Sequence, residues 1–313
     1  MMPQRSAVAR MSVRRDVARV LITEPVNAPL TPLSGLEIED REGLWRDRAG
    51  LLAVLKGCAG LIVRNQTRVD EELIRGAPDL RVVGRLGAGL DNLDLDALRA
   101  RSIAVVHGAG LNARAVAEYV IGACLALARG LVRSDGEVRR GEWLRHVGFE
   151  LRGQSLGVVG LGATGAETAR LALSLGMKVT GYDPLLAPPA GVEGLGLDDL
   201  LSRSRIVSVH VPLNDATRGL LSAAHFARMP RGALVINAAR GGVVDEAALI
   251  AALDSGHLAG AALDVRSKEP PRAGDPFAHR RDVLLTAHLA GLTTESQAAI
   301  AHHVLTGVRE ALT

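Results

Sequence analysis

The sequence predicts an α/β protein built from two doubly wound parallel sheets. Apolar runs of strand length alternate with helical patterns from one end of the chain to the other, which is typical of parallel α/β architecture. Near the middle of the sequence, a glycine-rich turn joins a strand to a helix. The 313 residues suit two domains of ordinary size, and no repeat of solenoid period is visible.

The first half of the chain contains four expected strands with helical patterns between them. The strands are Arg19–Thr23, Gly60–Val63, Arg81–Gly84 and Ile103–Val106, and the helical patterns are Gly43–Leu55, Asp70–Arg75 and Asp94–Ala100. This alternation predicts one parallel sheet with helices packed on it.

The second half contains six expected strands. They are Ser155–Gly160, Lys178–Tyr182, Ile206–Val211, Ala233–Asn237, Ala259–Val265 and Val283–Thr286. Two long helical patterns, Ala113–Val132 and Thr293–Leu312, stand on either side of these strands and suit a crossover between domains. We therefore expect a discontinuous first domain, residues 1–112 plus 293–313, and a second domain, residues 113–292.

The turn after Ser155–Gly160 matches the phosphate-binding fingerprint of dinucleotide-binding folds. Gly160 permits the tight strand-to-helix turn, Gly162 lets the backbone approach a pyrophosphate, and Gly165 allows close helix–strand packing. The N-terminus of the helix is then aimed at the phosphates. A bare GxGxxG is weak evidence in a chain with 35 glycines, but the ordered strand, turn, helix and second strand are specific. The sequence therefore predicts a Rossmann domain that binds a nicotinamide cofactor.

Asp183 ends the second strand of this unit, at the position that accepts hydrogen bonds from an adenosine ribose. Its charge would repel a 2′-phosphate, and the following Pro184 and Leu185 supply no compensating cation. We therefore expect NAD rather than NADP.

Three later segments carry polar residues where apolar strands end. Arg240 follows one strand, Asp264 and then Glu269 follow the next, and His288 follows the third. The carboxyl ends of parallel strands form the edge where ligands bind in open α/β sheets. Beside a nicotinamide, an arginine can bind the carboxylate of a 2-oxo acid, a histidine can donate a proton to its carbonyl oxygen, and a carboxylate can orient the histidine.

Each of these residues also has an ordinary explanation when taken alone. A histidine at a strand end is more often a surface histidine, Arg240 could be a turn residue, and Glu269 could belong to a plain loop. Their order behind a complete cofactor fingerprint favours the catalytic interpretation.

The sequence resembles the D-isomer-specific 2-hydroxyacid dehydrogenase family, most nearly its phosphoglycerate dehydrogenase-like branch. The resemblance covers roughly residues 60 to 312. The matching segments are Leu61–Arg64, Gly84–Asn92, Asn112, Val116–Glu118, Val209–Leu213 with Thr217, Ala239–Gly241, Asp264–Pro270 and His288–Gly291. The resemblance implies a flavodoxin-like substrate domain ahead of the Rossmann domain and a homodimer formed through the Rossmann domain.

The resemblance also implies a role for individual residues. It makes His288 the acid and base, Glu269 its partner and Arg240 the cation that orients the substrate. The implied cofactor contacts are Gly160, Gly162, Ala163, Thr164, Gly165, Asp183, Val211, Pro212, Ala238, Ala239, Asp264 and Gly291, with Asp264 near the nicotinamide amide. The implied substrate contacts are Arg64, Asn65, Gly87, Ala88, Gly89, Arg240 and His288.

Two departures from the family pattern bear on the substrate and on regulation. Position 65 is often serine in the phosphoglycerate branch and is asparagine here, which puts phosphoglycerate itself in doubt. The chain stops shortly after the helix that follows Gly291, so we expect no C-terminal regulatory domain.

We expect an NAD-dependent oxidoreductase that interconverts a small D-2-hydroxy acid and its 2-oxo acid. Arg64, Asn65 and either Arg85 or Arg114 are spare donors that would suit an anionic group at C3, as in a 3-phosphoglycerate-like or sulfolactate-like acid. A formate- or phosphonate-type dehydrogenase on the same scaffold and a non-enzymatic NAD(H) sensor stay open as alternatives.

Composition narrows the possible partners and compartment. The pI is near 9.2, but the net charge is only +3 and the basic residues are scattered among 34 acids, so no nucleic-acid partner is expected. No apolar run approaches the roughly 18 residues of a membrane span. Cys58 and Cys124 form no CxxC pair, so neither a metal site nor a disulfide framework is expected and a cytoplasmic location fits. The arginine-rich stretch Met1–Arg15 is expected to be an extension or the product of a misassigned start codon.

Overall fold

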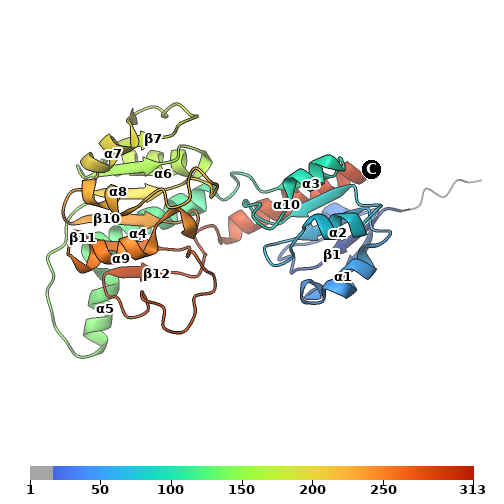
Figure 1. Ribbon diagram of the computed structural model, residues 1–313, viewed down its shortest axis with the longest axis horizontal. Coiled ribbons are helices and arrows are strands. Elements are labelled where there is room, and N and C mark those ends of the chain that lie inside the picture. The colour runs from blue at the N-terminus through green and yellow to red at the C-terminus, as the bar shows by residue number, and fades with distance from the viewer. Residues whose placement is uncertain (1–16) are drawn as a thin grey trace, which may run out of the picture. The chain divides into compact units, whose positions relative to one another are not determined.

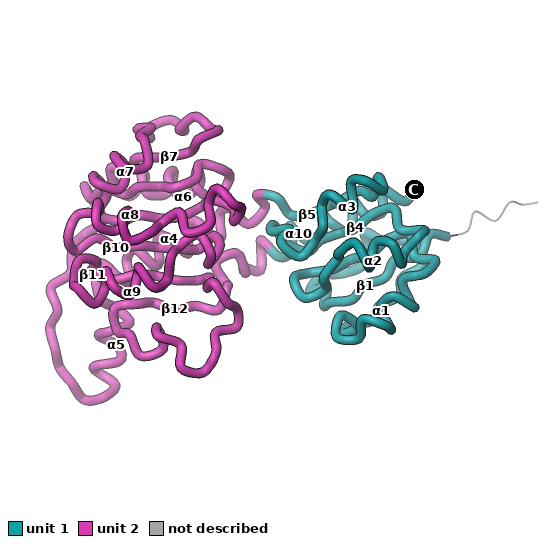
Figure 2. The backbone as a smooth tube through the Cα atoms, viewed as in Figure 1, with its two compact units in different colours: residues 1–109, 297–313 teal, residues 110–296 magenta. Residues whose placement is uncertain are grey.

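A computed structural model describes residues 17–313, and the chain divides into two compact units (Figure 2). Unit 1 takes the chain up to Ala109 and again from Gln297 to Thr313, and unit 2 runs from Gly110 to Ser296. The stretch Met1–Arg15 lies outside the described residues. Each unit contains one fully parallel sheet, so the predicted fold class is confirmed.

Unit 1 is built on a five-stranded sheet, in which Figure 1 labels β1. The strand order is β2-β1-β3-β4-β5, which is the flavodoxin-like order. Its strands are β1 (Arg19–Ile22), β2 (Glu37–Asp40), β3 (Gly60–Val63), β4 (Val82–Arg85) and β5 (Ala104–His107). Its helical segments are η1 (Thr31–Leu33), η2 (Leu44–Arg46), α1 (Arg48–Leu55), α2 (Glu71–Gly76) and α3 (Leu95–Ala100).

Alternate residues of the unit 1 strands enter two separate cores, one on each face of the sheet. Leu61 and Val83 pack with α1, α2 and α3, whereas Ile62 and Val82 pack with helix α10 (Thr294–Leu312). This alternation follows from the two-residue period of a strand. Because both faces are buried, the middle strands are apolar except for Arg19 at the start of β1 and Arg85 at the end of β4.

Unit 2 is built on a seven-stranded sheet in the order β12-β11-β10-β9-β6-β7-β8. The strands are β6 (Ser155–Val159), β7 (Lys178–Tyr182), β8 (Glu193–Gly194), β9 (Ile206–Val209), β10 (Ala233–Asn237), β11 (Leu258–Leu263) and β12 (Val283–Leu285). Chain order reverses between β6 and β9, so this is the doubly wound Rossmann order, and ligands bind at such a switch point.

Helices cover both faces of the unit 2 sheet. They are α4 (Ala113–Arg129), α6 (Ala163–Ser174), α7 (Leu197–Arg203), α8 (Ala223–Arg228) and α9 (Glu246–Asp254). Helix α5 (Leu131–Arg139) packs against α4, and η3 (Gly241–Val243) is a short turn after β10. One core contains α7, α8 and α9, and the other contains α4 and α6. The long apolar side chains of Leu200, Phe226 and Leu249 fill the first core, while small residues such as Ala169 allow α6 to lie close to the sheet in the second.

Several elements differ from the sequence-based expectation, and β2 and α4 differ most. The edge strand β2 was not expected, because its sequence Glu-Ile-Glu-Asp lacks the apolar run of a buried strand. The single helix expected over Ala113–Val132 is interrupted at Gly130, which adopts a left-handed φ of 59° and joins α4 to α5 with a bend of 58°. Glycine tolerates this conformation without a Cβ penalty, so the helix ends there.

Membrane-spanning potential is limited to one pair of elements. Within residues 17–313, no single helix has the length and apolar character to cross a membrane, and only the bent pair α4–α5 meets those two criteria together.

Candidate active site

The turn between β6 and α6 has the geometry that a bound pyrophosphate requires. A Cβ built on Gly165 would lie 1.9 Å from the carbonyl oxygen of Gly160, so only glycine allows this helix–strand approach. A Cβ on Gly162 would meet nothing within 4 Å, and no side chain caps the first turn of α6. The amides of Ala163 and Thr164 therefore start the helix beside open space, and the turn fits an anionic dinucleotide.

Asp183 follows β7 and is held by three backbone amides. Its Oδ2 accepts from the amide of Leu161 at 2.8 Å, and its Oδ1 accepts from Leu185 and Leu186 at 2.9 and 3.0 Å. Partial burial opposes ionisation, yet these hydrogen bonds hold the pKa of Asp183 below its ordinary value. The carboxylate is thus a fixed anion beside the glycine turn, which suits ribose hydroxyls and opposes a 2′-phosphate.

The other expected cofactor contacts lie in the segments that follow the strands of the same sheet. Val211 and Pro212 follow β9, Ala238 and Ala239 follow β10, Asp264 follows β11, and Gly291 comes after β12. A Cβ on Gly291 would lie 2.7 Å from Nδ2 of Asn112, so the backbone there approaches the start of α4 closely. All the cofactor candidates therefore belong to the carboxyl edge of the unit 2 sheet.

His288 and Glu269 form a hydrogen-bonded pair at this edge. Nδ1–H of His288 donates to Oε2 of Glu269 at 2.8 Å, and the imidazole and carboxylate side chains are 52% and 38% exposed. With Nδ1 engaged, Nε2 is the ring nitrogen left to exchange a proton with a substrate.

The charges around this pair favour the imidazolium–carboxylate state. The hydrogen bond to Glu269 raises the pKa of His288 above its ordinary value, although burial and the charge of Arg240 oppose the shift and Asp264 assists it. Burial opposes ionisation of Glu269, yet hydrogen bonds from His288 and the Arg266 amide, with the charge of Arg240, hold its pKa below the usual range.

His288 has a left-handed backbone, with φ of 52°. This conformation is uncommon outside glycine and persists where neighbouring structure enforces it. The amide of His288 donates to the carbonyl of Asp264 at 2.8 Å, and the Asp264 carboxylate accepts from the amides of Leu289 and Ala290 at 2.8 and 2.9 Å. It also accepts from the Thr286 hydroxyl at 2.6 Å. Asp264 is 1% exposed, and these bonds make it the anchor of the turn that presents His288.

Arg240 lies at the end of β10, and its backbone is fixed from within unit 2. Nδ2 of Asn237 donates to the Arg240 carbonyl at 2.9 Å, and Nη1 of Arg240 donates to the Ala239 carbonyl at 2.7 Å. Its charge acts on both His288 and Glu269. Unit 2 therefore brings the three residues expected to be catalytic into one electrostatic group.

The expected substrate residues of unit 1 follow two adjacent strands, β3 and β4. Arg64 and Asn65 begin a turn whose amides are held by the buried carboxylate of Glu24: Arg64 N–H and Thr67 N–H donate to Oε1 at 2.9 and 2.8 Å, and Gln66 N–H donates to Oε2 at 3.0 Å. Nδ2 of Asn92 donates to the carbonyls of Arg64 and Thr67 at 2.9 and 2.7 Å. The turn is thus restrained through both its donors and its acceptors.

The Gly87–Gly89 turn follows β4 and lies under the side chain of Arg85. A Cβ on Gly87 would lie 1.5 Å from Nη1 of Arg85, so a larger residue there would displace the Arg85 guanidinium. The carbonyl of Gly87 accepts from the amide of Gly108 at 2.9 Å, and Nδ1 of His107 lies 3.0 Å from the carbonyl of Ala88. These bonds fix the turn against the end of β5.

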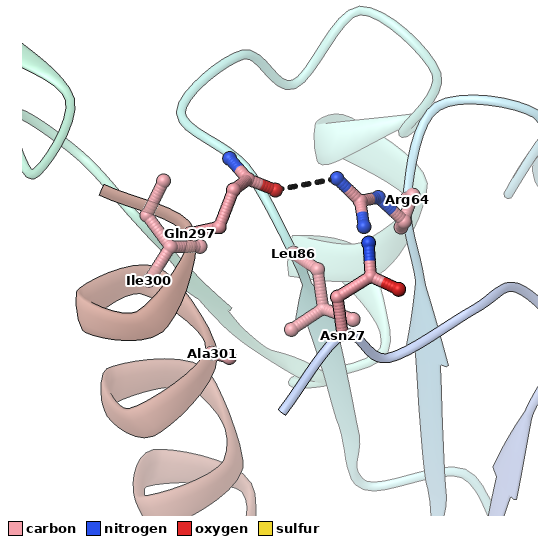
Figure 3. A pocket seen from close by; sticks show the side chains of 6 residues that line it. All are labelled: Asn27, Arg64, Leu86, Gln297, Ile300 and Ala301. Carbon is pink, nitrogen blue, oxygen red and sulfur yellow. Dashed lines mark hydrogen bonds between the residues drawn. The ribbon is translucent and has the colours of Figure 1, made fainter. Parts of the chain in front are cut away.

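Arg64 is hydrogen-bonded to neutral groups. Its Nη2 donates to Oε1 of Gln297 at 2.6 Å, its Nη1 donates to the carbonyl of Pro25 at 3.4 Å, and Asn27 and Gln297 both reach toward it (Figure 3). Across residues 17–313, no carboxylate is within ion-pair distance of its guanidinium. Arg114 differs, because its guanidinium pairs with Glu118 and Glu167 in unit 2.

Sequence reasoning missed four residues that support these groups. Glu24 and Gln297 hold Arg64, while Glu246 and Arg266 hold the segment that carries Glu269. Arg266 lies three residues from Glu269, and the other partners lie 20 or more residues from the residues that they bind. None of the four belongs to a pattern that hydrophobic periodicity can detect. An acid directly after the first apolar strand, as Glu24 is, was the one local signal.

Comparison with known proteins defines the class. Residues 121–290 match the family described as D-isomer specific 2-hydroxyacid dehydrogenase, NAD binding domain. The chain belongs to this family, its branch is the D-3-phosphoglycerate dehydrogenase-like one, and its cofactor is NAD.

Three similar proteins show how far the similarity extends along the chain. A D-3-phosphoglycerate dehydrogenase of Archaeoglobus fulgidus is 40% identical over 288 residues, which are 89% of this chain and 54% of the relative. The chain therefore spans about half the length of that relative. An (S)-sulfolactate dehydrogenase of Chromohalobacter salexigens is 45% identical over 273 residues, 85% of this chain and 88% of the relative. A D-lactate dehydrogenase from Aquifex aeolicus, solved with NAD and lactic acid, is 27% identical and superposes with a TM-score of 0.82 over 92% of this chain and 94% of that one.

Proposed function

We propose that the protein is an NAD-dependent oxidoreductase that interconverts a small D-2-hydroxy acid and its 2-oxo acid. The observation that carries this proposal is the His288–Glu269 hydrogen bond of 2.8 Å, with the charge of Arg240 acting on both groups. An acid–base pair and a cation at the ligand edge of an NAD-binding sheet are what this reaction needs.

In the proposed reaction, Arg240 binds the substrate carboxylate and orients the carbonyl through its forked donors. In reduction, the imidazolium of His288 gives its Nε2 proton to the carbonyl oxygen, and in oxidation neutral His288 takes a proton from the hydroxyl. Glu269 keeps the ring oriented and stabilises its charged form. NAD, when bound, supplies the hydride acceptor and NADH the hydride donor. Ala163, Thr164, Gly165 and Asp183 are the residues that would hold the cofactor.

We propose an anionic group at C3 of the substrate, as in a 3-phosphoglycerate-like or sulfolactate-like acid. Arg64 supports this, because within residues 17–313 the acceptors of its guanidinium are neutral oxygens of Gln297 and Pro25, so its positive charge is not paired with a carboxylate. The clamp of Glu24 and Asn92 supports it further, since a restrained turn loses little freedom when a ligand binds. The substrates named for two relatives are a phosphorylated acid, 3-phosphoglycerate, and a sulfonated acid, sulfolactate.

The test is a panel of 2-oxo acids with NADH, followed through the nicotinamide absorbance. It should include pyruvate, 2-oxobutyrate, and three-carbon oxo acids with carboxylate, sulfonate or phosphate at C3. Turnover of 2-oxo acids supports the proposed function. Oxidation of formate or a phosphorus oxyacid alone would replace it with the alternative dehydrogenase, and NADH binding without any turnover would favour a sensor.

We also propose a homodimer formed through unit 2. The segment from α5 to Val147 supports this, because it leaves Trp143 76% exposed and Val147 102% exposed, with Leu131 and Val132 also at the surface. Apolar side chains grouped on a projecting helix and the extended stretch after it are typical of an association surface. Light scattering on the wild type and on Trp143→Ser tests this: a dimer that the substitution weakens supports the surface.

The proposal includes a cytoplasmic protein with no nucleic-acid or membrane partner. The free, buried Cys58 and Cys124 and the net charge of +3 support it. Fractionation of cells that express the tagged full chain is the corresponding test.

A further inference from the structure

Arg266 is a buried cation that has no role in the proposed reaction. It follows β11, its side chain is 9% exposed, and its guanidinium lies between two carboxylates. Nε and Nη2 donate to the two oxygens of Glu246 at 3.1 and 3.0 Å, and Nη1 donates to Asp275 at 2.8 Å. The guanidinium also lies 4.5 Å from the centre of the Phe277 ring. Burial of a guanidinium is costly unless it is paired, and these two carboxylates provide the pairing.

The backbone next to this guanidinium holds the partner of the proposed acid. The amide of Arg266 donates to Oε1 of Glu269 at 2.9 Å, which leaves Oε2 to accept from Nδ1 of His288 at 2.8 Å. The amide of Ser267 donates to Oε1 of Glu246 at 2.7 Å. Glu246 therefore fastens both the side chain of Arg266 and the peptide that follows it.

The same segment contacts the turn that carries Arg240. A Cβ built on Gly241 would lie 1.9 Å from the carbonyl carbon of Arg266, so the two backbones are in direct contact. Glu246 is the first residue of α9, only five positions after Gly241. The ion pair thus connects the Arg240 turn to the Glu269 segment.

We infer that Glu246 and Arg266 are positioning residues that orient the Glu269 carboxylate toward His288. Neither touches the reacting atoms, and they act through the Arg266 amide. The inference rests on the proposed function for its effect on turnover, but its structural part concerns the His288–Glu269 bond alone.

The charged groups that face His288 are Glu269, Arg240 and Asp264. Of these, Glu269 is the one that accepts from the Arg266 amide. Loss of the Arg266 anchor should therefore weaken the Glu269 contact and make the imidazole easier to deprotonate. If Arg266 acted only through its positive charge, its removal would raise the pKa of His288, because a nearby cation disfavours the imidazolium. In Arg266→Met the sign of the pKa change therefore separates positioning from direct electrostatics, whereas in Glu246→Gln the loss of an anion lowers the pKa of His288 by either route.

The experiment is an NMR titration of the His288 ring in the full-length protein, with the signal assigned by its absence in His288→Asn. We expect both Arg266→Met and Glu246→Gln to move the titration of His288 to lower pH. At pH values between the titration midpoints of the variant and the wild type, kcat/KM for 2-oxo acid reduction should be roughly tenfold lower in the variant. This is a partial loss of general-acid catalysis. The KM for NADH should stay within about twofold of the wild-type value.

The matched control is Asp282→Asn. Asp282 forms the same two-point contact with Arg280, through Nε and Nη2 at 2.9 and 2.7 Å, in the same unit. This variant should leave the titration of His288 unchanged.

A folded Arg266→Met protein in which His288 titrates at the wild-type pH, or higher, overturns the inference. If the single variants do not fold, the double variant Arg266→Met with Glu246→Gln removes both charges together and is read in the same way. The titration needs no turnover, so an inactive wild type would refute the proposed function while the NMR result still decides this inference.

Discussion

Nδ1 of His288 lies 2.8 Å from Oε2 of Glu269, and the two residues shift each other's pKa in opposite directions. The pair combines a left-handed histidine backbone with a carboxylate whose other oxygen accepts from the Arg266 amide. Each half is therefore held by its own segment, and the imidazole retains one free nitrogen. Substitutions in this pair should separate proton transfer from cofactor binding.

His288→Asn should lower kcat for 2-oxo acid reduction by about 100-fold or more, because the proton donor is lost. Asparagine is the substitution of choice, since it tolerates the φ of 52° better than alanine does. The Kd for NADH, measured by fluorescence titration, should change little. His302→Asn, an exposed histidine of α10, is the control. Near-normal turnover of His288→Asn under chemistry-limited conditions would contradict the assignment.

Glu269→Gln should shift the pH dependence in a defined direction. Glu269 raises the pKa of His288, so reduction, which needs the imidazolium, persists to higher pH in the wild type and is lost as pH rises through that pKa. Without the anion the pKa falls, and the alkaline limb of reduction should move to lower pH. The acidic limb of oxidation, which needs neutral His288, should move the same way.

These limbs are measured as kcat/KM against pH in both directions. Glu295→Gln, at the start of α10, is the control substitution. Coincident limbs for wild type and Glu269→Gln would show that Glu269 does not set the proton affinity of His288.

Asp183 should make the protein select NADH over NADPH by roughly 100-fold in kcat/KM, because like charges in contact cost several kcal/mol. Asp183→Asn should narrow that ratio, and its one carbonyl oxygen can still accept from the amides of Leu185 and Leu186, although the amide of Leu161 loses its acceptor. Steady-state kinetics with both cofactors measures the ratio, and Asp199→Asn in α7 serves as the control. Comparable efficiency with both cofactors in the wild type would exclude this role.

Arg64→Ala should lower kcat/KM for a C3-anionic oxo acid by about tenfold to 100-fold, since a charge-assisted contact contributes roughly 1.5–3 kcal/mol. The value for pyruvate should stay within about twofold of wild type. Arg68→Ala is a matched control, because Arg68 lies near the same turn with its side chain 82% exposed. Preference of the wild type for uncharged substrates, unchanged in Arg64→Ala, would remove Arg64 from the site.

Glu24→Gln should lower the free energy of unfolding by roughly 1–3 kcal/mol, because an amide group replaces one acceptor oxygen and turns a donor toward a backbone amide. Glu24 is 2% exposed, so water cannot compensate. Urea denaturation measures the change. Glu42→Gln, an exposed acid of the same unit, should be close to neutral, and equal stabilities for all three proteins would show that the Glu24 bonds contribute nothing net.

The sequence by itself determined the fold class and the strands that are buried on both faces. The expected limits of β3, β7 and β10 coincide with those observed. β3 and β10 are apolar over almost their whole length, and Asp183 directly follows the end of β7. The glycine fingerprint, Asp183, Arg240 and His288 could also be found, because each stands at the end of an expected strand. The acidic edge strand β2 could not, since it forms through pairing with β1 and not through its own pattern.

Only the tertiary structure decided which residues hold the functional groups in place. The Asp264 carboxylate binds the turn of His288, Glu24 binds the turn of Arg64, and Glu246 binds Arg266. These are hydrogen bonds between segments about 20 to 40 residues apart, and a one-dimensional pattern carries no signal for them. These bonds are important because the carboxylates are sheltered from water and need hydrogen-bond donors from the protein. The donors come from the segments that the fold places beside each carboxylate.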